Sequence, residues 1–273
     1  ELYSATIEVC KILDIELDEE VLKGASCTGA GVLQEKNLRL GDTLNARTFA
    51  MAEKSGNPLM TICSTCQGVM SQANERLLAD PEYLASINED LQEEGLEYKG
   101  TADPKHLLWI IAEDLGIDFL ESKLVNKLDG LKLAPFYGCY IVRPTKALGF
   151  AENPGRKQAL EMVIESVGAE VVDFPGKTLC CGFPILTINP ENSVNMVANH
   201  TIDAKDRGAD AMVTPCPLCH LNLDGYQPNA ASARKREIDL PIIHLPQLLG
   251  LALGISPEKM RLNKHIVSTK KLL

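Results

Sequence analysis

Five cysteines punctuate the stretch from Cys139 to Cys219, which holds Cys139, then Cys180-Cys181-Gly182, then the C-x-x-C of Cys216-Pro217-Leu218-Cys219. An apolar run precedes two of these positions: Lys132–Tyr137 leads to Cys139, and Ala211–Thr214 leads to Cys216. Short apolar runs of this kind are typical of buried strands. We infer that the thiols stand near the ends of buried strands and build a metal site.

Strands and helices alternate around these cysteines. We expect helices over Lys157–Ser166 and Ser193–Arg207, and further strands over Glu170–Phe174 and Pro241–Ile243. Such alternation is typical of a parallel sheet covered by helices. The predicted fold class is α/β, with a small, mostly parallel sheet flanked by helices.

The first half of the chain repeats the cysteine pattern of the second half, and the matched positions share one spacing. Counterparts of Cys180, Cys181, Gly182, Cys216 and Cys219 lie 153 positions earlier, at Cys27, Thr28, Gly29, Cys63 and Cys66. Further along, His106–Ile117 corresponds to His244–Ile255 at a spacing of 138. Self-similarity at a fixed period indicates copies of one structural unit. We therefore predict two tandem homologous modules, residues 1–128 and 129–273.

The first module is a degenerate copy of the second. Thr28 occupies the position of Cys181, and the counterpart of Cys139 falls before Glu1. The chain also opens without Met inside a helical pattern, which we interpret as a missing N-terminal segment. We expect that segment to supply a fourth thiol to the first module.

Composition narrows the class of protein. A formal net charge of -10 repels phosphate backbones, so we expect no nucleic-acid partner. The most apolar segment, Leu240–Ile255, is shorter than the roughly 20 residues of a membrane span. We interpret it as a strand followed by a buried helix, with docking at a membrane surface as the alternative. Nine cysteines in a chain of 273 residues without a signal peptide favour metal or redox chemistry over a disulfide framework.

The adjacent pair Cys180-Cys181 favours a cluster of several metal ions over a single ion. Neighbouring thiolates rarely bind one small ion without strain, but they can bind or bridge different irons of a cluster. Gly182 lets the backbone come close to such a cluster. A structural zinc site or a set of unrelated buried thiols is the alternative.

The complete pattern, C-x(40)-C-C-G-x(33)-C-x-x-C, resembles the cysteine-rich CCG domain family. The residues around the cysteines also resemble this family. They are Phe136-Tyr137-Gly138 before the first cysteine, His220 after the last, and His244–Gly250 further on. The sequence is similar to the B subunit of heterodisulfide reductase and to the CCG-domain subunit of class E succinate dehydrogenase and fumarate reductase. The resemblance covers nearly the whole chain and is specific in the second module.

The resemblance implies a noncubane 4Fe-4S cluster in the second module. Its ligands would be Cys139, Cys180, Cys181, Cys216 and Cys219. In the first module the hydroxyl of Thr28 is a poor substitute for a soft bridging thiolate. With an upstream thiol added, Cys27, Cys63 and Cys66 are suited to a 4Fe-4S cubane or to zinc.

One complete noncubane motif favours electron transfer. We expect an iron–sulfur electron-transfer subunit of a multi-subunit oxidoreductase, most similar to the class E succinate dehydrogenase or fumarate reductase type. Its partners would be a ferredoxin-like iron–sulfur subunit and a flavoprotein subunit, with a quinone or a thiol as acceptor. The alternatives are a thiol/disulfide reductase acting at the noncubane cluster and a zinc-stabilised scaffold without redox function. We expect a cytoplasmic protein, with peripheral association at the inner face of the cell membrane as an option.

Five further residues are candidates for supporting the cluster: His220, His244, His106, Arg143 and Lys146. The alternatives are structural roles for the histidines and solvated surface charge for the two cations. Cys10 lies on an apolar helix face and is interpreted as a core thiol. The acidic stretch Glu89–Glu97 is interpreted as a solvated face or a docking surface.

Overall fold

The chain forms two compact units built from interleaved segments. The computed structural model describes residues 2–21 and 23–273. The first unit comprises Glu1–Glu16, Leu108–Cys139 and Gly155–Leu273, and the second comprises Leu17–Leu107 and Tyr140–Pro154. These units are defined by compactness, whereas the two modules are defined by the sequence repeat. The module boundary between residues 128 and 129 stays a prediction.

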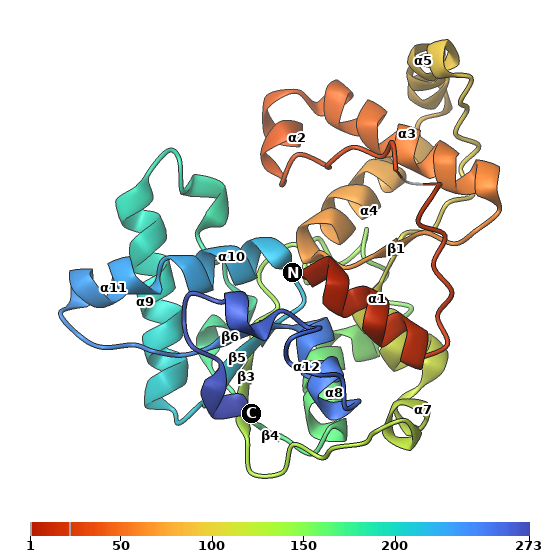
Figure 1. Cartoon of the computed structure of the whole chain (residues 1–273). Helices are drawn as coiled ribbons and strands as arrows, with labels where there is room; N and C mark the ends of the chain where they lie inside the picture. Colours follow the sequence, from red (N-terminus) through yellow and green to blue (C-terminus); the bar gives the residue numbers. More distant parts are fainter. Residues whose placement is uncertain (1, 22) are drawn as a thin grey trace. The chain divides into compact units, whose positions relative to one another are not determined.

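A four-stranded parallel sheet forms the centre of the first unit (Figure 1). Its strands run in the order β4 (Glu170–Val171), β3 (Lys132–Pro135), β5 (Ala211–Thr214) and β6 (Ile242–His244). Every neighbouring pair is parallel. All residues of β5 and β6 are buried, as expected for strands covered on both faces. The predicted α/β class with a parallel sheet is confirmed.

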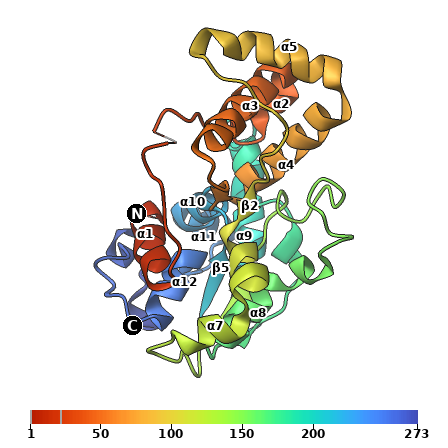
Figure 2. The same ribbon diagram turned by 90° about the vertical axis from the view of Figure 1, so that its right-hand side faces the viewer.

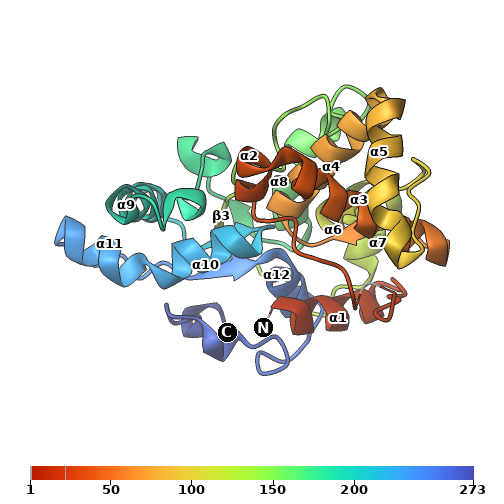
Figure 3. The same ribbon diagram turned by 90° about the horizontal axis from the view of Figure 1, so that it is seen from above.

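The helices of the first unit pack on this sheet or on one another. They are α7 (Ile117–Ser122), α8 (Ala159–Ser166), α9 (Pro190–Asp206), α10 (Pro217–Gly225), α11 (Gln227–Arg234) and α12 (Leu245–Ala252), together with α1 (Leu2–Ile12). The α1 helix lies beside α12 (Figure 1), and α9 lies beside α11 (Figure 3). Every residue of α12 is buried, so the prediction of a strand followed by a buried helix over Leu240–Ile255 is confirmed.

A helical layer dominates the second unit. Its helices are α2 (Val32–Lys36), α3 (Leu38–Ser55), α4 (Ser64–Ala79) and α5 (Pro81–Leu91), and its sheet is the parallel pair β1 (Met60–Thr61) and β2 (Lys105–His106). Figure 2 shows α3, α4 and α5 packed together. Phe49, Leu77, Ile87 and Tyr98 form the core between them. The sequence pattern did not predict α5, although Asp80 caps it by accepting from the Glu82 and Tyr83 amides.

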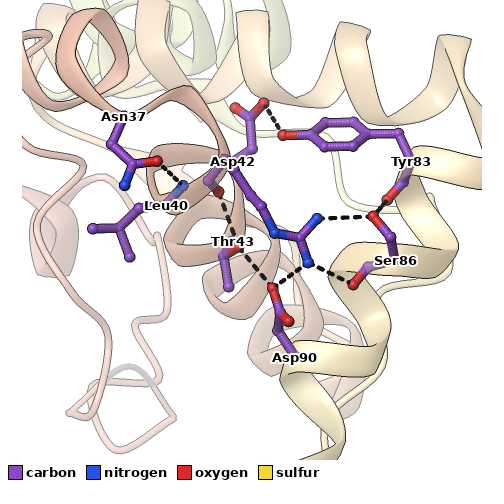
Figure 4. A network of polar contacts seen from close by, with 8 residues as sticks. Asn37, Leu40, Asp42, Thr43, Tyr83, Ser86 and Asp90 are labelled. Carbon is purple, nitrogen blue, oxygen red and sulfur yellow. Dashed lines mark hydrogen bonds and ion pairs between the residues drawn. The ribbon is translucent and has the colours of Figure 1, made fainter.

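A buried ion pair joins the helices of this layer. The Asp42 side chain on α3 is fully buried and accepts from Arg76 Nε at 3.0 Å and Nη2 at 2.6 Å. Figure 4 shows the Tyr83 hydroxyl donating to the same carboxylate, at 3.0 Å. Arg39 lies further out and binds Asp90 and Ser86. The carboxylate of Asp42 therefore connects α3, α4 and α5 at one point.

The two modules share local geometry at the positions that the repeat matches. Thr61 pairs with His106 across β1 and β2, and Thr214 pairs with His244 across β5 and β6. Cys63 and Cys216 are both N-cap residues, with φ and ψ of −134° and 117° in one case and −131° and 118° in the other. This agreement in backbone supports the prediction of two homologous modules.

Candidate metal centre

The five cysteines of the second module all belong to the first unit, in three short segments. Cys139 follows β3, and Cys180-Cys181 lies between two single turns of 3₁₀ helix. Cys216 caps α10, and Cys219 lies in its first turn. The parallel sheet places the ends of β3 and β5 at one edge, because parallel strands share a direction.

The five thiols influence one another through successive side-chain hydrogen bonds. The thiol of Cys139 hydrogen-bonds with Cys180, and Cys180 with Cys181. Cys181 continues the chain to Cys219, and Cys219 to Cys216. None of these cysteines forms a disulfide. The structure therefore brings together all five residues that the sequence selected.

The thiols shift one another's pKa values through their hydrogen bonds. Hydrogen bonds, first from Cys139 and then from Cys181, lower the pKa of Cys180 far below its ordinary value. The bond to Cys180 raises the pKa of Cys139, with burial as the next cause. The pKa of Cys219 is also raised, first through its bond with Cys181. Cys180 is thus the thiol of this set whose deprotonated form its neighbours stabilise.

Two glycines allow the cysteine segments to meet. Gly138 has a φ of 72°, and a Cβ atom there would lie 2.8 Å from Cys219 Sγ. Gly182 has a φ of 95°, and a Cβ atom there would lie 3.0 Å from the Ser193 carbonyl oxygen. Both positions combine left-handed backbone with a close neighbour, so only glycine fits without strain.

A polar network fixes two of the cysteine segments to each other. The amides of Tyr137 and Gly138 donate to the Lys177 carbonyl oxygen at 2.8 and 3.3 Å. The Lys177 ammonium pairs with Glu161 at 2.9 Å, and the Tyr137 hydroxyl donates to the same carboxylate. Burial raises the pKa of Tyr137 well above its ordinary value, so the phenol stays protonated as a donor. The segment before Cys139 and the segment before Cys180 are therefore held together.

The first module keeps the local arrangement of the second module but has a hydroxyl in place of the Cys181 thiol. The Thr28 hydroxyl lies 3.7 Å from Cys66 Sγ, which is the contact that Cys181 makes with Cys219 in the second module. Cys63 is buried, Cys66 is half-buried and Cys27 is exposed. The expected fourth thiol upstream of Glu1 lies outside the described residues. The structure thus places the Thr28 hydroxyl where the second module has the sulfur of Cys181.

The candidate histidines are buried. His220 and His265 pack edge to face with ring centroids 4.7 Å apart, and Gln247 contacts His265 at 2.9 Å. Burial, with the nearby His265 and His244, lowers the pKa of His220 to about 3, so its ring is neutral. His106 and His244 end β2 and β6 at matching places. These positions agree with a structural role for the histidines, and a role beside a cluster stays a prediction.

Arg143 and Lys146 belong to the second unit, in the segment that follows Cys139. Lys146 is 88% exposed and pairs with Glu75 at 2.6 Å. Arg143 is also exposed. Cys10 is fully buried and its pKa is raised to about 11 by that burial, as expected for a core thiol. The charged residues of Glu89–Glu97 are exposed, in agreement with a solvated face.

Sequence reasoning missed three buried polar residues, Ser193, His200 and Asn222, which bond to the Cys180-Cys181-Gly182 loop. They come from α9 and α10 and carry no motif of their own. The available signal was that these polar residues stand among apolar neighbours, two of them in the predicted helix Ser193–Arg207.

The thiols fit an iron–sulfur cluster better than a single ion. Within residues 2–21 and 23–273, no three His, Cys, Asp or Glu side chains converge as ligands of one metal ion. The five thiols of the second module interact with one another, and thiolates are the usual ligands of iron–sulfur clusters. Cysteine-rich, parallel α/β modules with such a set define a class of metal-binding redox proteins.

Comparisons with known proteins assign the family. Residues 1–71 and 133–224 match the cysteine-rich domain (CCG) family, and the chain belongs to it. The 8-methylmenaquinol:fumarate reductase membrane anchor subunit of Wolinella succinogenes is 36% identical, over 97% of this chain and 90% of the relative. The B subunit of the Ferredoxin/F(420)H(2)-dependent CoB-CoM heterodisulfide reductase of Methanosarcina acetivorans is 33% identical, over 95% and 87%.

A solved structure agrees on the fold. The crystal structure of a hypothetical protein from Helicobacter pylori superimposes with a TM-score of 0.76 at 16% identity, over 99% of this chain and 50% of that one. Together, the sequence relatives make the chain an oxidoreductase subunit, and the family indicates iron–sulfur cluster binding. No helix in the described part of the chain is long and apolar enough to span a bilayer.

Proposed function

We propose that this protein is an iron–sulfur electron-transfer subunit of a multi-subunit oxidoreductase of the succinate dehydrogenase or fumarate reductase type. One observation carries the proposal: five thiols that form no disulfide interact with one another in the second module, while the first module has Thr28 in place of one of them. A chain with one complete set is suited to transferring electrons. The fumarate reductase relative supports the choice of type.

In this proposal Cys139, Cys180, Cys181, Cys216 and Cys219 hold a noncubane 4Fe-4S cluster. When bound, the cluster supplies one-electron transfer. The protein's own residues orient the thiolates, exclude water by burying Cys181, Cys216 and Cys219, and provide N–H groups to the sulfurs.

The first module would hold a second metal centre. Cys27, Cys63 and Cys66 are the thiols available to it, and Thr28 excludes a bridging sulfur. A 4Fe-4S cubane and zinc are both compatible with thiolate ligands.

The proposed partners are a ferredoxin-like iron–sulfur subunit and a flavoprotein subunit, with a quinone or thiol acceptor. We place the complex in the cytoplasm, at the inner face of the cell membrane. The name of the fumarate reductase relative, a membrane anchor subunit, supports association with a membrane.

Anaerobic EPR spectroscopy with metal analysis tests the proposal. The wild-type protein should contain about four or more irons per chain and show a noncubane signal. Cys181→Ser should remove that signal. Cys10→Ser is the matched control, because Cys10 is equally buried but lies in the core of α1. Zinc without iron, or a signal that survives Cys181→Ser, contradicts the proposal.

A thiol/disulfide reductase is the second candidate, because two Methanosarcina relatives at 33% and 32% identity are the B subunits of heterodisulfide reductases. Addition of a thiol to the oxidised protein distinguishes it from the first. Direct binding of a substrate sulfur would change the EPR signal of the second module, whereas a pure electron carrier would keep its spectrum.

A further inference from the structure

Three buried side chains hold three consecutive carbonyl groups of the Cys180-Cys181-Gly182 loop. His200 Nε2 lies 2.8 Å from the Cys180 oxygen, and Asn222 Nδ2 lies 2.8 Å from the Cys181 oxygen. The Ser193 hydroxyl donates to the Gly182 oxygen at 2.9 Å. We call Ser193, His200 and Asn222 the carbonyl clamp.

The clamp determines where the amide hydrogens of the loop point. In a trans peptide the C=O and the following N–H point in opposite directions. Holding the Cys181 carbonyl therefore turns the Gly182 N–H the other way, where it lies 3.4 Å from Cys180 Sγ. Holding the Gly182 carbonyl turns the Phe183 N–H toward the sulfur of Cys181, to which it donates. Each of the two adjacent thiols thus receives a backbone hydrogen bond.

The members of the clamp are buried and tied to one another. Ser193 and Asn222 are fully buried, and His200 is 7% exposed. Asn222 Nδ2 also lies 3.3 Å from the Ser193 hydroxyl. The amide oxygen of Asn222 finds no hydrogen-bond partner among residues 2–21 and 23–273. A buried amide with an unpaired oxygen is unfavourable for stability, which indicates that its donor atoms serve the loop.

The first module lacks the clamp. Counted from the N-cap residues Asn37 and Asn189, Ser193 corresponds to Gly41 and His200 to Thr48. Gly41 has no side chain, and the Thr48 hydroxyl donates to the Leu44 oxygen within its own helix.

Counted from the N-cap residues Cys63 and Cys216, Asn222 corresponds to Val69, which has no polar group. The carbonyl clamp therefore occurs in the second module, which has two adjacent cysteines. At the corresponding positions of the first module, where Thr28 replaces one cysteine, no side chain is placed to hold the loop in this way.

We propose that Ser193, His200 and Asn222 are positioning residues that raise the reduction potential of the cluster held there. Asn222 and Ser193 direct the N–H groups of Gly182 and Phe183 at the sulfurs of Cys180 and Cys181, and His200 fixes the carbonyl that precedes them in the same loop. The inference rests on the proposed function. Hydrogen bonds to cluster sulfurs stabilise the more negative, reduced state, so their loss makes the potential more negative. Residues that orient metal ligands also slow metal loss.

A redox titration followed by EPR, together with iron release to a chelator, tests the clamp in the full chain under anaerobic conditions. Asn222→Val installs the residue that the first module uses. We expect a more negative potential and roughly 10- to 100-fold faster iron release. His200→Leu should act in the same direction, and His200→Gln should restore wild-type behaviour, because the Gln amide can replace the Nε2 donor.

Gln227→Leu is the matched control. Gln227 is 2% exposed and its amide donates to the Leu223 and Leu240 oxygens, away from the cysteine loop. The Gln227→Leu change should lower the midpoint temperature of unfolding without shifting the reduction potential of the cluster. An unchanged reduction potential in folded His200→Leu and Asn222→Val protein overturns this inference and leaves the proposed function intact. An equal shift in Gln227→Leu protein has the same consequence. A wild-type protein without the noncubane signal overturns the proposed function and the inference with it.

Discussion

Replacing Asp42 by Asn should destabilise the second unit far more than the same change at Asp90. Asp42 is fully buried, and its carboxylate accepts three hydrogen bonds, two from Arg76 and one from Tyr83 (Figure 4). Asn keeps the shape but removes the charge and turns an N–H₂ group toward one of these donors. The change should therefore affect packing little and electrostatics strongly.

The magnitude follows from the exposure of the two partners. Breaking a buried ion pair costs about 3–5 kcal/mol when the remaining charge is left without solvent. The Arg76 side chain is 30% exposed, so water stabilises part of its charge after the change. We expect the free energy of unfolding to fall by about 2–4 kcal/mol. Asp90→Asn breaks a pair whose side chains are 48% and 43% exposed, and should cost about 0–1 kcal/mol.

Chemical denaturation followed by far-UV circular dichroism measures both values, since α3, α4 and α5 contribute much of the helical signal. Wild type, Asp42→Asn and Asp90→Asn are compared in one buffer. Equal losses in the two variants would refute the reasoning, because burial is the main difference between the two carboxylates. A loss below about 0.5 kcal/mol in Asp42→Asn would refute it as well.

Three further predictions concern the cysteine sites and pH. Thr28→Cys alone should not create a second noncubane EPR signal, because the first module lacks the side chains that hold the loop; a second signal would contradict this. Gly138→Ala places a Cβ atom 2.8 Å from Cys219 Sγ and should accelerate iron release to a chelator roughly 10-fold or more, while Gly155→Ala, with open space around it, should not. Burial, followed by the negative charge of a neighbouring carboxylate, raises the pKa of Tyr83 from 10.0 to about 12. The unfolded phenol loses its proton first, so stability should fall as pH rises from 10 toward 12. Denaturation midpoints should fall less steeply in Tyr83→Phe than in wild type, and equal slopes would count against this assignment.

Much of the fold could be predicted from local patterns. The strands before Cys139 and Cys216 were predicted because a short apolar run followed by a turn residue is informative by itself. The predicted strand over Glu170–Phe174 is confirmed for Glu170–Val171, and the Val172 amide still donates to the Leu133 oxygen of β3 at 2.9 Å. The helix α5 was missed because its buried side is narrow, with Ile87 and Leu91 as its buried residues.

The sequence by itself determined the thiols, their spacing and the repeat of 153 positions, because these are properties of residue order. It also identified Thr28 as the position where the two modules differ. Only the tertiary structure revealed the interleaved compact units and the carbonyl clamp. The reason is physical: Ser193, His200 and Asn222 reach the loop from two helices, and these begin 9 residues (α9, at Pro190) and 36 residues (α10, at Pro217) after Cys181. Such hydrogen bonds depend on how helices pack, which local sequence patterns do not encode.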